Sequence, residues 1–302
     1  MSNVPVDPLN AFILDRNPQN LIELRQCFAE LALGHFNNSL PEIGESVDDV
    51  VIATVDGIDI TVDVHVPKGE GPFPVVVFSH GGGWSTGSSK THRKLGFRLA
   101  EAGLLTVNVN YRLAPEHPFP SGHDDCRLAL DWVRNNAGKY GGDVSRLALG
   151  GDSAGGLLAA AVAVHDANSK TPIRALALIY PALELESYPA MIRAFPEGLP
   201  NVTQWVFEGL LPEKYRASLA DPRISPLNAA ERFPPTVLVY SPEDPSVIVG
   251  CEALPPKLET AGIVHETVVL AGMPHGFMQM EEVFPEAKEA LNQMTEFLLR
   301  QL

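Results

Sequence analysis

The stretch 147–158 constrains the fold of this chain most strongly, because it has the pattern of a strand, a very tight turn and a helix. Its sequence is L-A-L-G-G-D-S-A-G-G-L-L, and Ser153 lies at the apex of the turn. Glycines two residues either side of the serine let the two backbones approach without Cβ clashes. The first N–H groups of the helix lie beside the hydroxyl and could hold a developing oxyanion. The stretch predicts a nucleophilic serine raised above the end of a sheet.

Strand and helix patterns alternate along the rest of the chain. An Asp-Gly pair at 56–57 separates two runs of alternating residues and predicts a hairpin, with His65 on its surface. Further strands are predicted at 74–79, 104–110, 173–180, 235–241 and 267–270, with helices between them. A chain of 302 residues with 45% hydrophobic content can bury a large core. The prediction is a doubly wound, mostly parallel α/β sheet.

Two segments interrupt this pattern. Residues 1–45 contain an amphipathic helix pattern, and prolines, aromatic residues and acids dominate 184–226. Both are expected to form a cap over the pocket, in which Trp205 and Phe207 are candidate substrate contacts. The predicted organisation is N-terminal cap helices at 1–45, a first part of the core at 46–183, a cap insertion at 184–226 and a second part of the core at 227–302.

Charge and cysteine content narrow the classes of partner. Lysine and arginine number 22 against 37 aspartates and glutamates, a net charge of −15 without a basic patch, which argues against nucleic acid and anionic membranes as partners. Three widely spaced cysteines, in no metal-binding pattern, indicate reduced thiols and no metal site. No signal peptide or membrane-spanning run is visible, so we expect a cytoplasmic protein without membrane insertion.

Three consecutive glycines follow the strand at 74–79, between His80 and Trp84. Such a run is costly unless the backbone itself is used, and the N–H groups of Gly82 and Gly83 could join that of Ala154 around one oxygen. The prediction is an oxyanion hole, with a merely flexible loop as the alternative.

Three residues at predicted strand ends form a candidate catalytic set. Ser153, Asp244 and His275 occur in the chain order that α/β-hydrolases use. His275 would accept the serine proton and return it to a leaving alcohol, and Asp244 would fix the histidine tautomer. Glu243 is the rival acid, but neighbouring residues of an extended segment point to opposite sides. His80 is the rival histidine and is expected to brace the glycine loop.

The proline-rich loop 111–120 is predicted to be rigid and structural. Arg112, Glu116, Asp124 and Asp125 are expected to form an ion-pair network that holds it beneath the site. A permanently charged arginine cannot serve as a base.

The chain resembles the bacterial hormone-sensitive-lipase-like esterases of the α/β-hydrolase superfamily, from about residue 45 to the C-terminus. The motifs that carry the resemblance are H-G-G-G-W at 80–84, the loop 111–120, G-D-S-A-G-G at 151–156, D-P at 244–245 and H-G-F at 275–277. One departure is S-V-I-V-G at 246–250, where the family commonly carries an acidic pair before a glycine. This departure puts in question what supports the aspartate loop.

The resemblance implies an α/β-hydrolase fold with an eight-stranded sheet and a helical cap, a small-molecule ester as substrate, no cofactor, and a homodimer formed through the last strand. It places Ser153, Asp244 and His275 in a triad and Gly82, Gly83 and Ala154 in the oxyanion hole. Trp84 joins the substrate contacts by its position after the glycines.

The function predicted from these features is serine carboxylesterase, acting on short- to medium-chain esters through an acyl-enzyme. An amidase or lactonase with the same triad remains an alternative. A non-catalytic small-ligand receptor is disfavoured, because receptors that resemble this family lack the triad histidine and His275 is present.

Overall fold

One sheet of eight strands forms the centre of the molecule. The computed structural model describes residues 8–187, 209–216 and 218–302. The strands are β1 (Glu45–Val55), β2 (Ile58–Val66), β3 (Phe73–Ser79), β4 (Leu105–Asn110), β5 (Gly142–Asp152), β6 (Ala175–Ile179), β7 (Thr236–Tyr240) and β8 (His265–Val269). Their spatial order is β1-β2-β4-β3-β5-β6-β7-β8. From β4 to β8 all neighbours are parallel, whereas β1 and β2 are antiparallel. The predicted fold class is confirmed.

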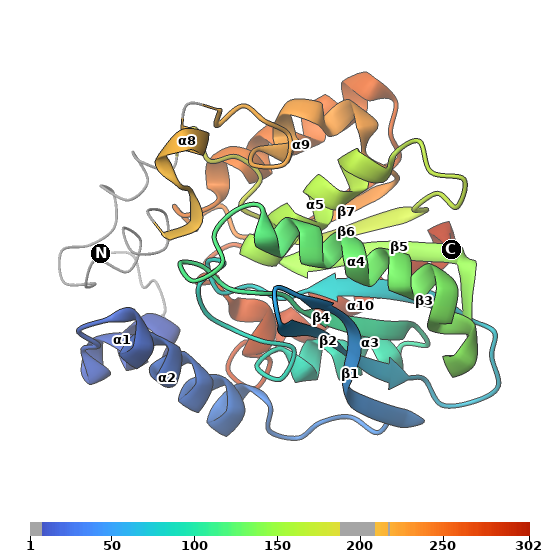
Figure 1. Ribbon diagram of the computed structural model, residues 1–302, viewed down its shortest axis with the longest axis horizontal. Coiled ribbons are helices and arrows are strands. Elements are labelled where there is room, and N and C mark those ends of the chain that lie inside the picture. Colours follow the sequence, from blue (N-terminus) through green and yellow to red (C-terminus); the bar gives the residue numbers. More distant parts are fainter. Residues whose placement is uncertain (1–7, 188–208, 217) are drawn as a thin grey trace.

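Helices cover both faces of this sheet. They are α1 (Pro8–Arg16), α2 (Leu21–Leu31), α3 (Arg93–Glu101), α4 (Ser121–Asn136), α5 (Ala154–Asp166), α8 (Glu213–Arg216), α9 (Ile248–Ala261) and α10 (Glu286–Gln301). A π-helical turn (Ala32–Phe36) extends α2, and 3-10 turns lie at Ala137–Tyr140, Pro226–Arg232 and Phe277–Gln279. Helices α4 and α5 pack together on one face, and α3 and α10 pack on the other (Figure 1). The apolar strands are therefore buried on both sides.

The α5 helix lies closest to the centre of the core. Every residue from Ala154 to Val164 is buried. Its sequence A-G-G-L-L-A-A-A-V-A-V allows this, because small side chains let neighbouring strands and helices approach closely. The helix that begins beside Ser153 is thus held firmly on every side.

The hairpin of β1 and β2 corrects one sequence-based expectation. His65 was expected on a strand surface but is fully buried. Its ring packs against Phe97 of α3, at 4.7 Å between ring centroids. Alternation along β2 gave no sign of this, because α3 comes from later in the chain and covers that face. Burial lowers the pKa of His65 to about 4.

The described helices of the two segments predicted as a cap lie on the same side of the sheet in Figure 1. Helices α1 and α2 precede the sheet, and α8 belongs to the long connection between β6 and β7 (Figure 1). Trp205 and Phe207 fall outside the described residues. A cap made of these segments stays a prediction.

Three further expectations concern the cysteines, a membrane-spanning helix and a homodimer. The cysteines are free and buried. No described helix has the length and apolar character needed to cross a bilayer. Strand β8, through which a homodimer was expected, is an edge strand; the homodimer itself stays a prediction.

Candidate active site

Ser153 connects β5 to α5 in a backbone conformation that non-glycine residues rarely adopt. Its φ is 52° and its ψ is −117°. A Cβ atom on Gly151 would overlap the carbonyl of Gly155, and one on Gly155 would overlap the carbonyl of Ser79. The spacing of glycines in the motif therefore comes from close backbone contact. This strained turn lifts the serine side chain above the end of the sheet.

Three side chains from distant parts of the chain meet at this turn. His275 Nε2 lies 2.9 Å from Ser153 Oγ, and His275 Nδ1 lies 2.6 Å from Asp244 Oδ2. A carboxylate can only accept a hydrogen bond, so Nδ1 carries the proton and Nε2 is left to accept the serine hydroxyl. The side chain of Asp244 is 3% exposed and that of His275 is 29% exposed. The arrangement can pass a proton between an accessible serine and histidine.

The aspartate loop holds Asp244 by contacts that the sequence analysis missed. The backbone N–H of Ser246 donates to Asp244 Oδ1 at 3.0 Å, and the Ser246 hydroxyl donates to the same oxygen. Burial alone would raise the pKa of Asp244, but its electrostatic interaction and hydrogen bond with His275, together with the hydrogen bonds from Ser246, hold it below its usual value. Ser246 thus supplies support in the segment where the family pattern is absent.

Glu243, the rival acid, points elsewhere. Its carboxylate accepts hydrogen bonds from the Gly272 N–H at 2.7 Å and from the Ser241 hydroxyl at 3.1 Å. The structure therefore brings Asp244, not Glu243, against His275. The ring of Tyr180 packs on the other side of His275, with centroids 5.0 Å apart, and helps to fix the ring plane.

The glycine loop after β3 lies beside the serine. Gly82 and Gly83 have φ values of 116° and 58°, in the region that favours glycine. Within the described residues, their backbone N–H groups meet no acceptor. The Ala154 N–H lies in the first turn of α5, where helix geometry offers no intrahelical partner. That these three donors converge on one oxygen at the serine stays a prediction.

A second aspartate–histidine pair, Asp152 and His92, supports this loop through a hydrogen bond to Gly81. Asp152 Oδ1 accepts the Gly81 N–H at 2.8 Å, and Asp152 Oδ2 lies 3.3 Å from His92 Nε2. Both side chains are almost completely buried. Burial would raise the pKa of Asp152, but the positive charge of His92 and hydrogen bonds from His92 and Gly81 lower it. No sequence motif indicated His92, which comes from the connection before α3.

Comparison with known proteins identifies the family. Residues 76–279 match the family described as the alpha/beta hydrolase fold. The chain is 30% identical over 269 residues to the ethyl acetate hydrolase of Pseudomonas putida, covering 85% of this chain and 84% of that protein. It is 36% identical over 251 residues to the carboxylesterase NlhH of Mycobacterium tuberculosis, covering 78% and 76%. The chain belongs to the α/β-hydrolase family.

Solved structures agree with this assignment. A hyperthermophilic esterase from the archaeon Pyrobaculum calidifontis superposes with a TM-score of 0.84 at 29% identity, over 99% of this chain and 100% of that one. Within the family, the chain is one of the hormone-sensitive-lipase-like carboxylesterases, as its motifs predicted. This hydrolase is thus a carboxylic ester hydrolase.

His80 braces the glycine loop of the hydrolase, as expected. Its Nδ1 lies 2.7 Å from the Gly81 carbonyl, and its ring stacks on Tyr111 at 4.2 Å between centroids. Burial, together with the charge of His92, lowers the pKa of His80 to about 3. This histidine is therefore neutral. It contacts Gly81 and Tyr111 and makes no hydrogen bond to Ser153 Oγ, so it does not compete with His275.

The expected ion-pair network under the loop 111–120 is only partly present. Arg112 Nη2 pairs with Asp125 Oδ1 at 2.9 Å. Glu116 pairs instead with Arg25 of α2, at 2.7 Å between Nη2 and Oε2. The expectation was wrong for Glu116 because its partner comes from a helix far away in sequence. Arg25 also donates to the Ser85 carbonyl at 2.7 Å, so α2 supports the glycine loop as well.

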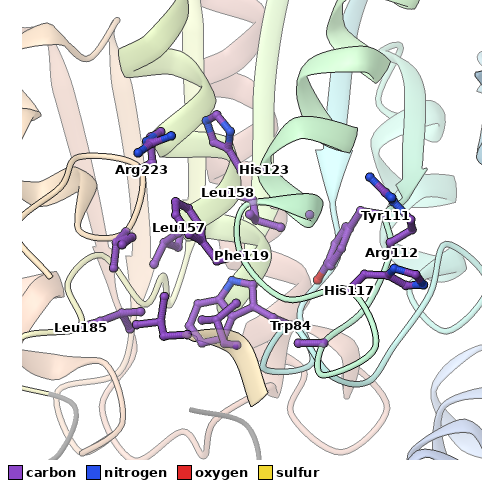
Figure 2. Close-up of a pocket in the computed structure, with 15 residues that line it drawn as sticks. Trp84, Tyr111, Arg112, His117, Phe119, His123, Leu157, Leu158, Leu185 and Arg223 are labelled. Carbon is purple, nitrogen blue, oxygen red and sulfur yellow. The ribbon is translucent and has the colours of Figure 1, made fainter. Parts of the chain in front are cut away.

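A cavity of the hydrolase lies beside Trp84, the residue that follows the three glycines (Figure 2). Its walls are mostly apolar and come from α5, from the loop 111–120 and from the connection between β6 and β7. The apolar lining includes Trp84, Phe119, Leu157, Leu158, Leu185, Leu210 and Leu211, and the polar lining consists of Tyr111, Arg112, His117, His123 and Arg223. Of the three predicted substrate contacts, Trp84 is thus on a cavity wall, and Trp205 and Phe207 lie outside the described residues. Among the described residues, no group of three acidic, histidine or cysteine side chains could hold a metal ion.

Proposed function

We propose that this hydrolase cleaves short- to medium-chain carboxylic esters by transferring the acyl group to Ser153. The observation that carries the proposal is the continuous chain of contacts from Ser153 Oγ to His275 Nε2, and from His275 Nδ1 to Asp244 Oδ2, at 2.9 and 2.6 Å. Both distances allow hydrogen bonds of the kind that activate a serine nucleophile. The proposed route needs no cofactor.

In the first half of the reaction, Ser153 Oγ forms a bond to the ester carbonyl carbon as its proton moves to His275 Nε2. The carbonyl π electrons move onto the oxygen, which accepts hydrogen bonds from the N–H groups of Gly82, Gly83 and Ala154. When the tetrahedral intermediate collapses, the bond to the alcohol oxygen breaks and that oxygen takes the proton from His275. An acyl-serine and a free alcohol result.

In the second half, water repeats the same steps. His275 takes a proton from the water, whose oxygen attacks the acyl carbon, and the proton then returns to Ser153 Oγ as the acid leaves. Asp244 stays ionised throughout. It keeps the histidine in the useful tautomer and stabilises the imidazolium that forms twice in each cycle.

The size of the substrate is inferred from two observations. The cavity beside Trp84 is small and mostly apolar, which suits a short alkyl chain better than a bulky group. One relative bears a name that specifies a very small ester, ethyl acetate. Both favour short and medium acyl chains over long ones.

The proposal is tested by hydrolysis of p-nitrophenyl esters from acetate to palmitate. We expect kcat/KM to peak at short or medium chains, and Ser153→Ala to lose at least about 10³-fold in kcat. Ser145→Ala, at an exposed serine of the same strand, is the matched control and keeps full activity. A p-nitrophenyl phosphonate should label Ser153 covalently, as read by peptide mass spectrometry. Unchanged turnover in Ser153→Ala, or label on another residue, would overturn the proposal.

A further inference from the structure

Helix α2 contacts the glycine loop through one arginine. Arg25 Nε donates a hydrogen bond to the carbonyl of Ser85 at 2.7 Å, and Arg25 Nη2 donates to the carbonyl of Ala114 at 2.8 Å. The same guanidinium forms a two-pronged ion pair with Glu116, at 2.9 and 2.7 Å. A single side chain of the N-terminal segment thus joins two loops of the core, the glycine loop and the loop 111–120.

The stretch of the glycine loop just before the Ser85 carbonyl is strained. Gly82, Gly83 and Trp84 have φ values of 116°, 58° and 59°. Glycine adopts such values readily, but they are unfavourable for a bulky residue such as tryptophan. A backbone conformation of this kind persists where the surrounding structure holds it. The supports of this stretch therefore decide where its N–H groups lie.

Successive carbonyls of the glycine loop have different supports. The carbonyl of Gly82 accepts the N–H groups of Ser85 and Thr86, at 3.2 and 2.9 Å, from within the loop. The Trp84 carbonyl accepts the Ala114 N–H at 2.9 Å, and the carbonyl of Ala114 is in turn bonded to the arginine. The Ser85 carbonyl accepts directly from the arginine. These two supports from outside the glycine loop both lead back to α2.

Helix α2 is itself anchored, so its arginine extends from a fixed backbone. Asn20 Oδ1 accepts the Glu23 N–H at 3.0 Å and caps the start of the helix. On the buried face of the helix, the side chains of Leu24 and Leu31 are at most 5% exposed. The helix is held by a cap at one end and by packing along one face.

The N-terminal segment also contacts the connection between the glycine loop and α3. The ring of Phe28, one turn further along α2 than the arginine, stacks on the ring of His92 with centroids 6.3 Å apart. Asn37 Nδ2 donates to the Lys90 carbonyl at 2.8 Å, and Asn37 Oδ1 accepts the Lys94 N–H at 3.0 Å. The segment therefore supports the chain from the glycine loop into α3 at several points.

The ion pair between Arg25 and Glu116 is too exposed to serve mainly the stability of the fold. The two side chains are 27% and 54% exposed. Water screens such pairs, so they add little to the free energy of unfolding. The planar guanidinium, in contrast, delivers its N–H groups in fixed directions to two backbone carbonyls. This arrangement suits a support that sets the geometry of a loop.

We propose that Arg25 is a positioning residue for the oxyanion hole, and that α2 thereby acts on the chemical step of ester hydrolysis and not on substrate entry alone. This inference rests on the function proposed above. In that function, the N–H groups of Gly82 and Gly83 receive the negative charge of the tetrahedral intermediate. A small displacement of these donors weakens hydrogen bonds that reach full strength in the transition state. Release of the Ser85 carbonyl allows such a displacement.

The first test removes the guanidinium. We would measure kcat and KM for p-nitrophenyl butyrate with the wild-type protein, Arg25→Ala and Arg16→Ala. Arg25→Ala should lower kcat by about 10- to 100-fold and change KM by less than about threefold, because the interaction it weakens belongs to the transition state. Arg16→Ala is the matched control, because Arg16 forms a surface ion pair with Glu30 of α2 at 3.4 Å, and it should keep full activity.

The second test returns the guanidinium from solution. The Arg25 side chain is 27% exposed, so the space left by its removal lies next to solvent. Low concentrations of guanidinium chloride should raise kcat of Arg25→Ala several-fold, whereas sodium chloride and urea should not. The wild-type protein and Arg16→Ala should not respond. A loss that came from general loosening of the N-terminal segment would not be restored in this way.

Two further variants separate charge from geometry. Arg25→Lys keeps the charge but loses the planar fork, so its kcat should fall nearly as far as that of Arg25→Ala. Glu116→Gln leaves the hydrogen bonds from the arginine to Ser85 and Ala114 in place, and it should lower kcat by less than about threefold. If Arg25→Ala does not fold, the comparison of Arg25→Lys with Glu116→Gln decides the question.

The outcomes separate this inference from the proposed function. An unchanged kcat in folded Arg25→Ala or Arg25→Lys would overturn the role of Arg25. A raised KM at unchanged kcat, or an equal loss of kcat in Arg16→Ala, would overturn it as well. Failure of the folded wild-type protein to hydrolyse the ester, or unchanged turnover in Ser153→Ala, would overturn the esterase mechanism itself.

Discussion

Two aspartate–histidine pairs lie near Ser153 in this hydrolase, one in contact with its hydroxyl and one that includes the preceding residue, Asp152. In the pair Asp244–His275, the nitrogens of the imidazole bridge the carboxylate and the serine hydroxyl, and the histidine is 29% exposed. In the pair Asp152–His92, both side chains are at most 3% exposed, and the aspartate holds the Gly81 N–H. The residue types are the same, but the surroundings are not.

The difference shows that the role of each histidine depends on the group that it contacts in addition to its aspartate. His275 faces a hydroxyl that can lose a proton, at an accessible position. His92 is enclosed by Thr91, at 2.9 Å from Nδ1, and by the Gln279 amide, at 2.9 Å from Nε2. We therefore expect the first pair to act on the substrate and the second to position the loop that receives the oxyanion.

The largest effect should come from the first histidine. His275→Ala removes the base that contacts the nucleophile, and we expect kcat to fall by about 10⁴- to 10⁶-fold. His92→Ala should cost far less, because it alters only the support of the loop. Steady-state hydrolysis of p-nitrophenyl butyrate by both folded variants measures the difference. Losses of equal size would contradict the division of roles between the pairs.

The acid of the first pair comes next. Asp244→Asn should lower kcat by about 10⁴-fold, since an amide allows the wrong histidine tautomer. Glu243→Gln is the control from the adjacent position, and it should stay within about threefold, because the Glu243 carboxylate bonds to Ser241 and Gly272 and not to His275. A greater loss of activity in Glu243→Gln than in Asp244→Asn would show that Glu243, not Asp244, is the acid that supports His275.

The acid of the second pair should have a smaller effect. Asp152→Asn keeps an oxygen for the Gly81 N–H but loses the charge beside His92, so we expect kcat to fall by about 10- to 100-fold with little change in KM. A transition-state analogue such as a trifluoromethyl ketone should lose affinity in parallel. If affinity for the analogue is unchanged while activity falls, Asp152 does not act through the oxyanion loop.

Acid should destabilise the buried region before it affects any carboxylate. The pKa of His80 is about 3 in the folded protein against 6.5 in the unfolded chain. The unfolded state therefore binds more protons between these values, and stability is lost as pH falls below 6.5. At pH 5 this one group should lower the free energy of unfolding by about 2 kcal/mol.

Urea unfolding at pH 7 and pH 5 tests the contribution of His80. His80→Gln should show a smaller loss between the two pH values than the wild-type protein. Carboxylates with lowered pKa, such as Asp152 and Asp244, destabilise only at lower pH, so they do not mask the result. An identical loss in the variant would show that His80 is not the responsible group.

The smallest effect should come from Ser246. Ser246→Ala removes one of several hydrogen bonds to Asp244 and leaves the Ser246 N–H in place. We expect kcat to fall by about three- to tenfold, the size of one ordinary hydrogen bond, because the Ser246 N–H still holds Asp244. Ser246→Thr keeps the hydroxyl and should restore most of the activity. A loss as great as that of Asp244→Asn would make Ser246 essential, contrary to the geometry.

Local sequence patterns were sufficient to predict the fold class and the tight turn that carries Ser153. The glycines around Ser153 and the glycine run after β3 lie at close backbone contacts. A Cβ atom would not fit there, so such contacts can be recognised from glycine in the sequence. Apolar runs likewise predict strands wherever a sheet is covered on both faces. These features depend on neighbours along the chain, so they were predictable without the structure.

Contacts between distant segments had to come from the tertiary structure. His65 packs against Phe97 of α3, Glu116 pairs with Arg25 of α2, and His92 pairs with Asp152. Each partner lies between 32 and 91 positions away in the printed sequence, and nothing in the local pattern indicates which polar groups will meet.

The pair Asp152–His92 is the clearest case. The sequence by itself determined the motif of the nucleophile, the order of strands and helices, and the family. Only the tertiary structure brought His92, from the connection before α3, against Asp152 at the end of β5. Periodicity records whether a residue is apolar or polar, whereas the pairing of a buried polar atom depends on which chain segments converge around it.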